Sequence, residues 1–301
     1  VADYNNILNM LYLILREYGG GKKLPKPAEP REVPAAVVCR PKDMKCYGSF
    51  KEFSTDFPFV EEKPVIAFLY YGHIYPMDYS GAVAEICERL QKSANVLPVV
   101  VSGMDGINDG TLKKLLTEFM PAKTELIMNC MSFRLSAGPM GGNISAGTDM
   151  LKELNVPYLH PLFMSRRTEK DWKDSVQGCT ASEVLISVML PEQDGAMLTL
   201  PVGAKTEPMY DEEFDVTSDE IKIIEERLEA LADRAERFIE LRKKARSAKK
   251  IAIICYNYPP GESNVFGGAF LDTFESVSAI LSLLKNNGYT AEEADAQKLM
   301  S

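Results

Sequence analysis

The sequence predicts an α/β fold: a doubly wound, mostly parallel sheet followed by the start of a second α/β unit. Continuous apolar runs of strand length, such as Val65–Tyr71, indicate strands that helices cover on both faces. Helical segments with one apolar stripe alternate with these runs. Because the connections between them are short, parallel strands joined by crossover helices are the expected topology.

The alternating region lies within residues 63–206, which we predict to be one α/β domain. Its expected strands are Val65–Tyr71, Leu97–Ser102, Glu125–Cys130, Tyr158–Phe163 and Met197–Val202. Its expected helices are Tyr79–Lys92, Asn108–Phe119, Ser145–Leu154, which ends at Asn155, and a segment near Ala181–Leu190 before the turn Pro191–Gly195. This order is typical of a Rossmann-like or flavodoxin-like sheet.

Residues 1–62 are predicted to form an N-terminal helix and a proline-rich arm. The helix, Val1–Tyr18, is apolar over much of its surface, so other structure has to cover it, and Gly19–Gly21 ends it. Prolines recur throughout the following segment, at Pro25, Pro27, Pro30, Pro34, Pro41 and Pro58. They argue against both helix and central strand, so we expect an extended arm.

Residues 207–248 are predicted to link two units through one amphipathic helix, Thr217–Arg246. Thr217 and Glu220 fit a capping box at its start. Its apolar residues recur at spacings of three and four: Ile221, Ile224, Leu228, Leu231, Ala235 and Phe238.

Residues 249–301 are predicted to be a partial second α/β unit. It would begin with a buried strand, Lys250–Tyr256, and continue with an amphipathic helix, Phe270–Asn287. The segments that start at Lys63 and Lys249 share one layout of strand, aromatic pair, turn and helix. This favours two related units, although any two units of a parallel sheet would look alike.

Composition restricts the class of protein. The 301 residues are 46% apolar and carry a formal charge of -9, which disfavours binding to a nucleic-acid backbone. No apolar run is long enough to span a bilayer, and we expect a cytoplasmic protein. Three of the six cysteines lie in apolar strand or helix patterns, and reduced, buried thiols are expected for Cys39, Cys46, Cys87, Cys130, Cys179 and Cys255.

The sequence contains no self-contained metal or nucleotide motif. His73 and His160 are far apart and have no further ligand at zinc spacing. Gly19–Lys23 lacks the spacing and the final Ser or Thr of a phosphate-binding loop, so this chain is not expected to bind ATP.

Candidate site residues follow the strands, because ligands of open parallel sheets bind beyond the carboxyl ends of the strands. Tyr71 and His73 follow the first strand, and Ser132 follows the third. His73 can act as a general base, a transient metal ligand or a hydrogen-bonding group, and a structural role is the alternative. Glu192 and Asp194 belong to a Pro-Glu-Gln-Asp-Gly turn, where solvated turn residues are equally common.

The turn Tyr256–Gly261 is a second candidate region. It leaves a strand sharply and leads towards a helix, so Tyr258, Gly261 and Asn264 could surround an anionic group near free N–H groups. A simple strand-to-helix turn with permissive glycines explains the same residues. The residues alone therefore predict a ligand-binding α/β module.

Several segments, taken in order, resemble the large tetrapyrrole-binding subunit of class I metal chelatases, the family of cobaltochelatase and the H subunit of magnesium chelatase. The matching segments are Val65–His73, Leu154–Tyr158, Glu169-x-x-Trp172-x-x-Ser175, Leu190-Pro191-Glu192-x-Asp194-Gly195 and Tyr256–Gly261 followed by Asn264-Val265. Tyr71-Gly72 stands where the family pattern has Arg-Ser/Thr before the histidine. The resemblance covers nearly the whole chain.

The resemblance implies insertion of Co(II) or Mg(II), as the substrate ion, into a corrin precursor or porphyrin, with ATP hydrolysed by separate AAA+ subunits. It implies His73 and Glu192 as catalytic residues, because metallation removes two pyrrole protons. Residues implied to bind the macrocycle are Tyr71, Ser132, Asp194, Tyr258, Gly261 and Asn264. Family members are much longer, so the chain is expected to be an internal portion that is inactive alone, without a bound cofactor. A non-catalytic small-ligand or interaction module of periplasmic-binding-like fold is the alternative.

Overall fold

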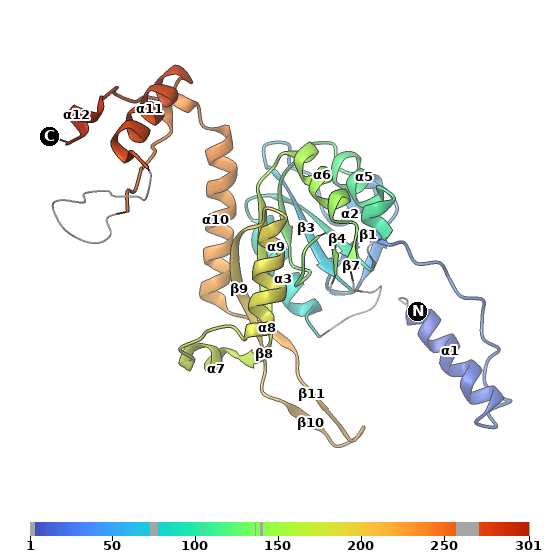
Figure 1. The fold of residues 1–301 in the computed structure, drawn as a ribbon. Helices are drawn as coiled ribbons and strands as arrows, with labels where there is room; N and C mark the ends of the chain where they lie inside the picture. The colour runs from blue at the N-terminus through green and yellow to red at the C-terminus, as the bar shows by residue number, and fades with distance from the viewer. Residues whose placement is uncertain are drawn as a thin grey trace. The chain divides into compact units, whose positions relative to one another are not determined.

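A computed structural model describes residues 4–72, 78–103, 105–135, 137–138, 141–256 and 271–300. The chain divides into two compact units, Val1–Ile239 and Glu240–Ser301. In the first unit, eight strands form one sheet in the order β12-β9-β8-β5-β3-β4-β1-β2 (Figure 1). These strands are β1 Ala36–Arg40, β2 Lys45–Tyr47, β3 Val65–Tyr71, β4 Asn95–Val101, β5 Thr124–Asn129, β8 Tyr158–Thr168, β9 Met197–Lys205 and β12 Ile221–Ile223.

The five neighbouring strands β9, β8, β5, β3 and β4 are parallel, which confirms the predicted doubly wound α/β sheet. Their bounds agree with the predicted strands to within a few residues, except that β8 and β9 continue further. Helices of this unit are α1 Tyr4–Glu17, α2 Phe50–Asp56, α3 Ser80–Gln91, α4 Asp105–Asn108, α5 Thr111–Glu118, α6 Ile144–Leu154, α7 Glu169–Asp174, α8 Ala181–Val184, the π-helix η1 Leu185–Met189 and α9 Leu190–Gln193. The short strands β6 Ala137–Gly138 and β7 Gly141–Gly142 pair with each other, as do β10 Met209–Asp211 and β11 Val216–Ser218.

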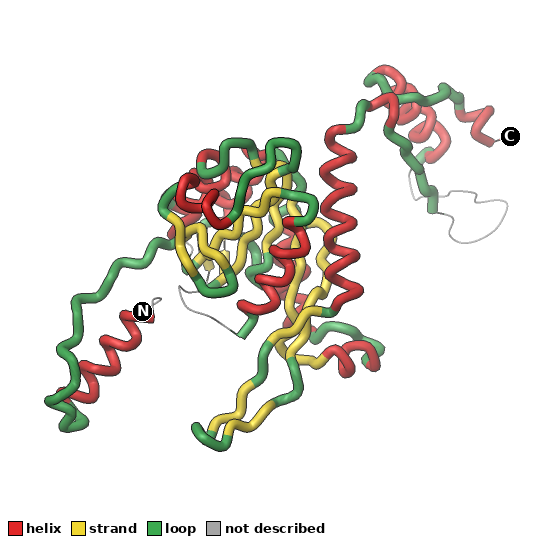
Figure 2. The backbone as a smooth tube through the Cα atoms, turned by 180° about the vertical axis from the view of Figure 1, so that it is seen from behind, coloured by secondary structure: helices red, strands yellow, loops and turns green. Residues whose placement is uncertain are grey.

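Both faces of the central strands are buried, as their continuous apolar runs predict. In β3, Ile66, Phe68 and Tyr70 pack on one face in a core shared with α3 and α10 (Glu225–Lys243). The alternate residues Val65, Ala67 and Leu69 pack on the other face with residues of α2, α5 and α6. Figure 2 shows helices on both sides of the sheet. Burial of one Leu or Phe side chain on folding stabilises the fold by about 1.5–3 kcal/mol. Burial on both faces of the sheet therefore holds the carboxyl ends of the strands in place.

Part of the predicted proline-rich arm belongs to the sheet, which corrects the expectation of an extended segment. β1 runs antiparallel to β4, with Val38 opposite Val99, and Val38 is fully buried. Pro34 and Pro41 flank this strand and do not interrupt it, so no ladder hydrogen bond is lost. The prediction gave the prolines too much weight and the apolar run between them too little.

The expectation that all cysteines are reduced is wrong for one pair. Cys39 and Cys46 form a disulfide and lie directly opposite each other in β1 and β2. Antiparallel pairing of β1 and β2 brings the two cysteines together. The disulfide could therefore be predicted only together with this hairpin, which was not expected from the sequence. Cys87 and Cys130 are buried thiols, and burial raises the pKa of each.

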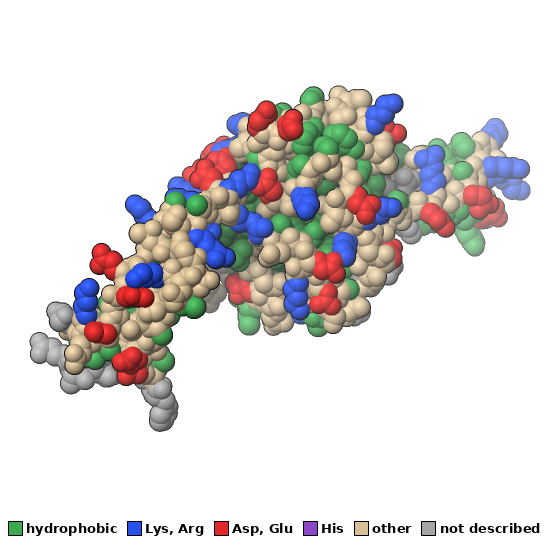
Figure 3. Space-filling view, turned by 90° about the horizontal axis from the view of Figure 1, so that it is seen from above, with side chains coloured by type: hydrophobic (Ala, Val, Ile, Leu, Met, Phe, Trp, Pro, Cys, Tyr) green, Lys and Arg blue, Asp and Glu red, His purple; other side chains and the backbone are tan. Residues whose placement is uncertain are grey.

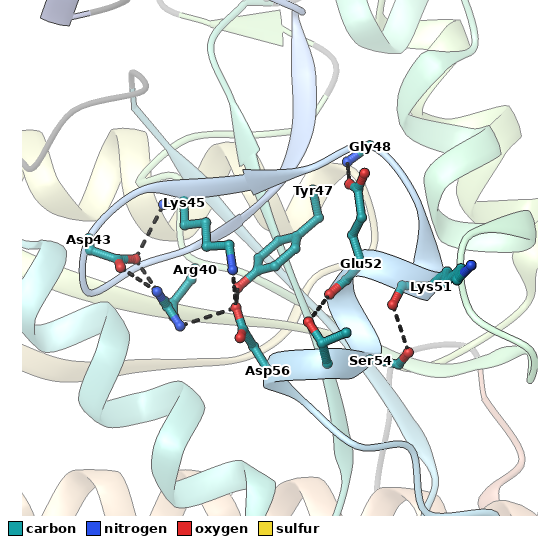
Figure 4. Close-up of polar contacts among 10 residues, drawn as sticks. Arg40, Asp43, Lys45, Tyr47, Gly48, Lys51, Glu52, Ser54 and Asp56 are labelled. Atoms are coloured by element: carbon teal, nitrogen blue, oxygen red, sulfur yellow. Dashed lines mark hydrogen bonds and ion pairs between the residues drawn. The ribbon is translucent and has the colours of Figure 1, made fainter.

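A polar network next to this hairpin joins it to α2. Asp56 accepts hydrogen bonds from Lys45 Nζ at 2.7 Å and Tyr47 Oη at 2.6 Å, and Arg40 approaches the same oxygen at 3.3 Å (Figure 4). These donors lower the pKa of the Asp56 carboxyl. Three donors on one carboxylate oxygen leave it little capacity for a ligand, so we assign this network a structural role.

The linking helix begins later than predicted. Residues 217–224 form β11 and β12 instead of helix, and α10 spans Glu225–Lys243, so the proposed capping box of Thr217 and Glu220 does not exist. Ile221 and Ile223 pair with β9, and Ile221 is buried. An Ile-Lys-Ile segment fits a strand as well as a helix, and the free edge of β9 decides between them.

In the second unit, the predicted buried strand Lys250–Tyr256 is absent. These residues have no strand pairing, and Ile254 is 93% exposed. The described part of this unit contains the 3-10 turn η2 (Arg246–Ala248), α11 (Thr273–Asn286) and α12 (Ala296–Met300). A strand needs a neighbour for its backbone groups, and among these described elements none is a strand.

The N-terminal helix α1 lies on the surface. The helix α1 has no buried residue in this structure, and Asn6 and Asn9 bond to the backbone of the arm at Arg31 and Ala28. The predicted cover over its apolar side chains is therefore not present within the described residues. Among these residues, no helix is both long and apolar enough to cross a bilayer.

Candidate functional site

The candidate site lies at the point where the sheet changes its winding direction. From β3 the chain passes through α3 to β4 on one side, whereas from β5 it passes through α6 to β8 on the other. The segments after β3 and β5 therefore diverge, which is the usual ligand position in open α/β sheets. Tyr71, at the end of β3, meets Phe133 from the segment after β5 edge to face, with ring centroids 5.4 Å apart.

The segment after β5, Cys130–Leu135, is held in a defined shape. Asn129 is fully buried, and its side chain accepts from Met131 N at 3.0 Å and donates to Tyr158 Oη at 2.7 Å. The next turn requires Ser132 in the left-handed region, with φ 62°. Such backbone strain costs on the order of 1 kcal/mol and needs surrounding contacts to maintain it.

A helical segment from later in the chain supplies those contacts. Residues 181–193 run continuously through α8, η1 and α9, and a capping box of Thr180 and Glu183 starts them. Ser187, in the π-helical turn, donates to the carbonyl oxygen of Ser132 at 2.9 Å. π-Helical turns occur often at functional sites, because they shift a side chain out of the regular helical register.

A buried ion pair fastens the same segment to the end of α9. The side chains of Arg134 and Asp194 are 8% and 1% exposed and form an ion pair. Asp194 also accepts from Arg134 Nε at 3.0 Å and from Leu135 N at 3.0 Å. Every one of these contacts orders the backbone that carries Ser132 and Phe133.

The sequence-predicted residues have different positions around this arrangement. Ser132 is half-buried, and Tyr71 is 37% exposed, so both can reach a ligand. Glu192 is exposed, and Thr199 Oγ1 lies 3.5 Å from its carboxylate. Asp194 is enclosed, so the structure gives it a positioning role, while direct contact with a substrate stays a prediction. His73, Tyr258, Gly261 and Asn264 lie outside the described residues.

Sequence reasoning missed the residues that build the site's frame. These are Asn129, Phe133, Arg134, Tyr158 and Ser187. Arg134 was detectable as a lone basic residue in an apolar segment directly after a strand, but its partner is 60 positions away. No local pattern connects two such residues.

The described residues contain no group of three or more His, Cys, Asp or Glu side chains that could hold a metal ion. Tyr71 and Phe133 provide an aromatic surface at the switch point, and Ser132 provides a hydroxyl beside it.

His160, in β8, gives a separate prediction for pH dependence. It is fully buried, neither ring nitrogen has a hydrogen-bond partner in the structure, and burial lowers its pKa from 6.5 to about 3. Below the ordinary pKa the unfolded chain binds a proton that the folded chain does not, so stability falls as pH falls from 6.5 towards 3. At pH 5 the loss is about 2 kcal/mol.

The measurement is urea unfolding of the chain and of His160→Leu at neutral pH and at pH about 5. Between neutral pH and pH about 5, His160→Leu should lose about 2 kcal/mol less stability than the unaltered chain. An identical loss in both proteins would show that His160 does not remain neutral in the folded chain.

Comparison with known proteins identifies the family. A family model described as CobN/Magnesium Chelatase matches residues 2–301. An uncharacterized protein of Methanocaldococcus jannaschii is 30% identical over 97% of this chain and 24% of its own length. The chloroplastic magnesium-chelatase subunit ChlH of Oryza sativa subsp. indica is 31% identical over 76% of this chain and 16% of its own. The aerobic cobaltochelatase subunit CobN of a Sinorhizobium species is 27% identical over 78% and 18%.

The fold also has a counterpart among solved structures. The catalytic subunit of cobaltochelatase from Mycobacterium tuberculosis aligns over 96% of this chain and 22% of that chain, with a TM-score of 0.61 and 20% identity. The present chain thus spans less than a quarter of the length of each of these proteins. Because the family match extends over residues 2–301, this chain belongs to the CobN/magnesium chelatase family.

Proposed function

We propose that this chain is a portion of the tetrapyrrole-binding subunit of an ATP-dependent metal chelatase, which inserts Co(II) or Mg(II) into a corrin precursor or porphyrin. The family match across residues 2–301 carries this proposal. Relatives named as magnesium-chelatase and cobaltochelatase subunits support both metals. In this proposal the protein is cytoplasmic, and separate AAA+ subunits hydrolyse the ATP.

The residues at the sheet's switch point have distinct roles in this proposal. Tyr71 and Phe133 lie in edge-to-face contact and offer apolar ring surface to one face of the macrocycle. Ser132 offers a hydroxyl to a polar substituent of the ring. Tyr258, Gly261 and Asn264 are proposed to bind a propionate or acetamide arm.

Metallation requires a base, because two pyrrole N–H protons leave as the ion enters. We assign this task to His73 and Glu192, whose side-chain types accept protons near neutral pH when placed beside the ring. Glu192 is exposed in the described structure, as a group that meets an incoming substrate has to be. Asp194 and Arg134 then keep the neighbouring backbone in the geometry that substrate binding needs.

Binding of a tetrapyrrole is the direct test. Hydrogenobyrinic acid diamide and protoporphyrin IX are titrated into the complete protein that contains this chain, and absorbance of the macrocycle is followed. Saturable binding of one of them is expected, and Tyr71→Ala should weaken it roughly tenfold through lost ring contact.

The matched control is Tyr18→Ala, since Tyr18 is 88% exposed after α1 and should not change the affinity. If the complete protein binds neither tetrapyrrole, the chelatase proposal is wrong. The non-catalytic ligand-binding module would then be the better interpretation.

A further inference from the structure

Tyr79 occupies the N-cap position of α3, a position that usually carries Ser, Thr, Asp or Asn. Its side chain makes no capping hydrogen bond to the helix. The Tyr79 hydroxyl instead donates to the backbone carbonyl oxygen of Tyr71, the last residue of β3. Because a poor N-cap residue destabilises its own helix, a Tyr at this position points to another role for the side chain.

The carbonyl group of Tyr71 lies past the end of the ladder between β3 and β5. The last residues paired in this ladder are Leu69 and Asn129, and Cys130 N donates to Leu69 O at 2.8 Å. Carbonyl groups two residues apart in a strand point to the same side, so the Tyr71 carbonyl also points towards β5. Because β5 ends at Asn129, the Tyr79 hydroxyl supplies a hydrogen bond in the place where a longer β5 would have supplied one.

The ring of Tyr79 reaches the other neighbour of β5. It stacks on Phe163 of β8, with ring centroids 6.1 Å apart and an interplanar angle of 27°. In the order of the sheet, β5 lies between β8 and β3. Tyr79 therefore connects β3 to β8 past the end of β5, next to the candidate site.

Backbone hydrogen bonds hold Tyr79 itself in place. Its carbonyl oxygen accepts from Val83 N of α3 at 3.0 Å, and the carbonyl oxygen of Asp78 accepts from Ile221 N of β12 at 3.1 Å. The Tyr79 side chain is half-buried and packs against the core that contains Phe163 and Ile221. A side chain whose backbone is anchored in this way can keep the end of β3 at a fixed position.

Short-range contacts decide what the aromatic rings at the switch point can bind. The face shown in Figure 3 carries interspersed acidic and basic side chains, which act on a ligand over a distance. Tyr71, Phe133 and Tyr79 are aromatic and act only at contact distance. Aromatic contacts depend on the geometry of the rings, and a ring that is fixed before binding loses less conformational freedom on binding.

We propose that Tyr79 is a positioning residue for the tetrapyrrole site. Its hydroxyl, bonded to the carbonyl oxygen of Tyr71, fixes the end of β3 so that the Tyr71 ring stays in edge-to-face contact with Phe133. Its ring, stacked on Phe163, ties this end to β8. The inference rests on the proposed function, in which Tyr71 and Phe133 offer their rings to the macrocycle.

Tyr79→Phe in the complete protein that contains this chain tests the proposal, because it removes the hydroxyl and keeps the ring. Affinity for hydrogenobyrinic acid diamide and for protoporphyrin IX is measured by absorbance titration. For the tetrapyrrole that binds, loss of one neutral hydrogen bond should weaken the affinity roughly fivefold. The double variant Tyr71→Ala, Tyr79→Phe should bind as weakly as Tyr71→Ala alone, since the ring that Tyr79 positions is then absent.

Hydrogen exchange of the Gly72 amide tests the hold on β3 without a ligand. Gly72 N donates to Val101 O at 3.2 Å, directly after the residue whose carbonyl oxygen Tyr79 binds. In Tyr79→Phe this amide should exchange roughly fivefold faster, because the end of β3 opens more often. Exchange is measured on the complete protein without tetrapyrrole, so failure of this inference and failure of the chelatase proposal give different results.

Tyr47→Phe is the matched control. It also removes one phenolic hydrogen bond, from Tyr47 Oη to Asp56 at 2.6 Å, but in the network next to the hairpin of β1 and β2. It should leave both the tetrapyrrole affinity and the exchange of the Gly72 amide unchanged. Thermal unfolding checks that each variant remains folded.

Three results would overturn the proposal. The first is an unaltered tetrapyrrole affinity, or an unaltered exchange rate of the Gly72 amide, in Tyr79→Phe. The second is a further fivefold loss of affinity when Tyr79→Phe is added to Tyr71→Ala, because Tyr79 would then act independently of the Tyr71 ring. The third is an equal loss of affinity in Tyr47→Phe, which would assign the effect to a general loss of stability.

Discussion

Asp194→Ala should lower the free energy of unfolding of this chain by about 3–5 kcal/mol, as expected when one partner of a buried ion pair is removed. The substitution leaves the Arg134 guanidinium, 8% exposed, without its counter-charge. It also leaves the Leu135 N–H, which now donates to Asp194 at 3.0 Å, without an acceptor. Denaturant unfolding followed by circular dichroism measures the change.

The double variant Arg134→Met, Asp194→Leu separates the charge from the shape of the site. Because it removes both charges together, it should recover a large part of the stability lost in Asp194→Ala. Tetrapyrrole binding, measured on the complete protein, should not recover with it, since the apolar pair cannot bond to the Leu135 backbone. Recovery of stability without recovery of binding would show that Arg134 and Asp194 position the site and do not only stabilise the fold.

An exposed pair provides the matched control. Lys170 and Asp174 are 2.6 Å apart on the surface, with side chains 82% and 65% exposed. Asp174→Ala should therefore change the free energy of unfolding by less than about 0.5 kcal/mol. A loss below about 1 kcal/mol in Asp194→Ala would show that Arg134 finds solvent or another partner when Asp194 is removed.

The parallel core could be predicted because its signals are local. Each central strand is a continuous apolar run, and each helix between strands has one apolar stripe, so strand and helix periods alone located β3, β4 and β5. Asn155, with φ 47° in the left-handed region, ends α6 at the residue where the sequence predicted the helix to end. Local propensity and tertiary environment agree at these positions.

The errors arose where a neighbouring strand decides the structure. Ala36–Arg40 and Ile221–Ile223 become strands because β4 and β9 offer free edges to them. Lys250–Tyr256 has a stronger strand pattern than either, yet it does not form a strand in the described part of its unit. Propensity for a strand is thus necessary for pairing, but a partner edge has to exist as well.

Some residues of the candidate site could likewise be predicted from the sequence, and others could not. Residues that follow strands directly, such as Tyr71 and Ser132, could be selected from the sequence because the carboxyl edge of a parallel sheet is where ligands bind. The ion pair of Arg134 and Asp194 and the bond from Ser187 to Ser132 join segments more than 50 residues apart. Only the packed structure reveals such contacts.

His73→Ala in the complete protein should slow metal insertion by about two to four orders of magnitude, the usual contribution of a positioned general base. Glu192→Gln should have a similar effect, because the amide keeps the shape of the side chain but cannot accept a pyrrole proton at neutral pH. Insertion is followed by the change in tetrapyrrole absorbance, in the presence of the partner subunits and ATP. Glu118→Gln, at an exposed position of α5, is the matched control and should insert metal at the unaltered rate.

Two further measurements distinguish catalysis from folding for these variants. Thermal unfolding should be nearly unchanged for Glu192→Gln, since Glu192 is exposed and its one described contact is 3.5 Å long. Tetrapyrrole affinity should also stay within about threefold, because a base that acts in the transition state contributes little to ground-state binding. Unimpaired insertion by Glu192→Gln would contradict its assignment as a base. A His73→Ala protein that inserts metal normally but unfolds at lower temperature would show that His73 has a stabilising role. The proton acceptor would then have to come from another part of the complete protein.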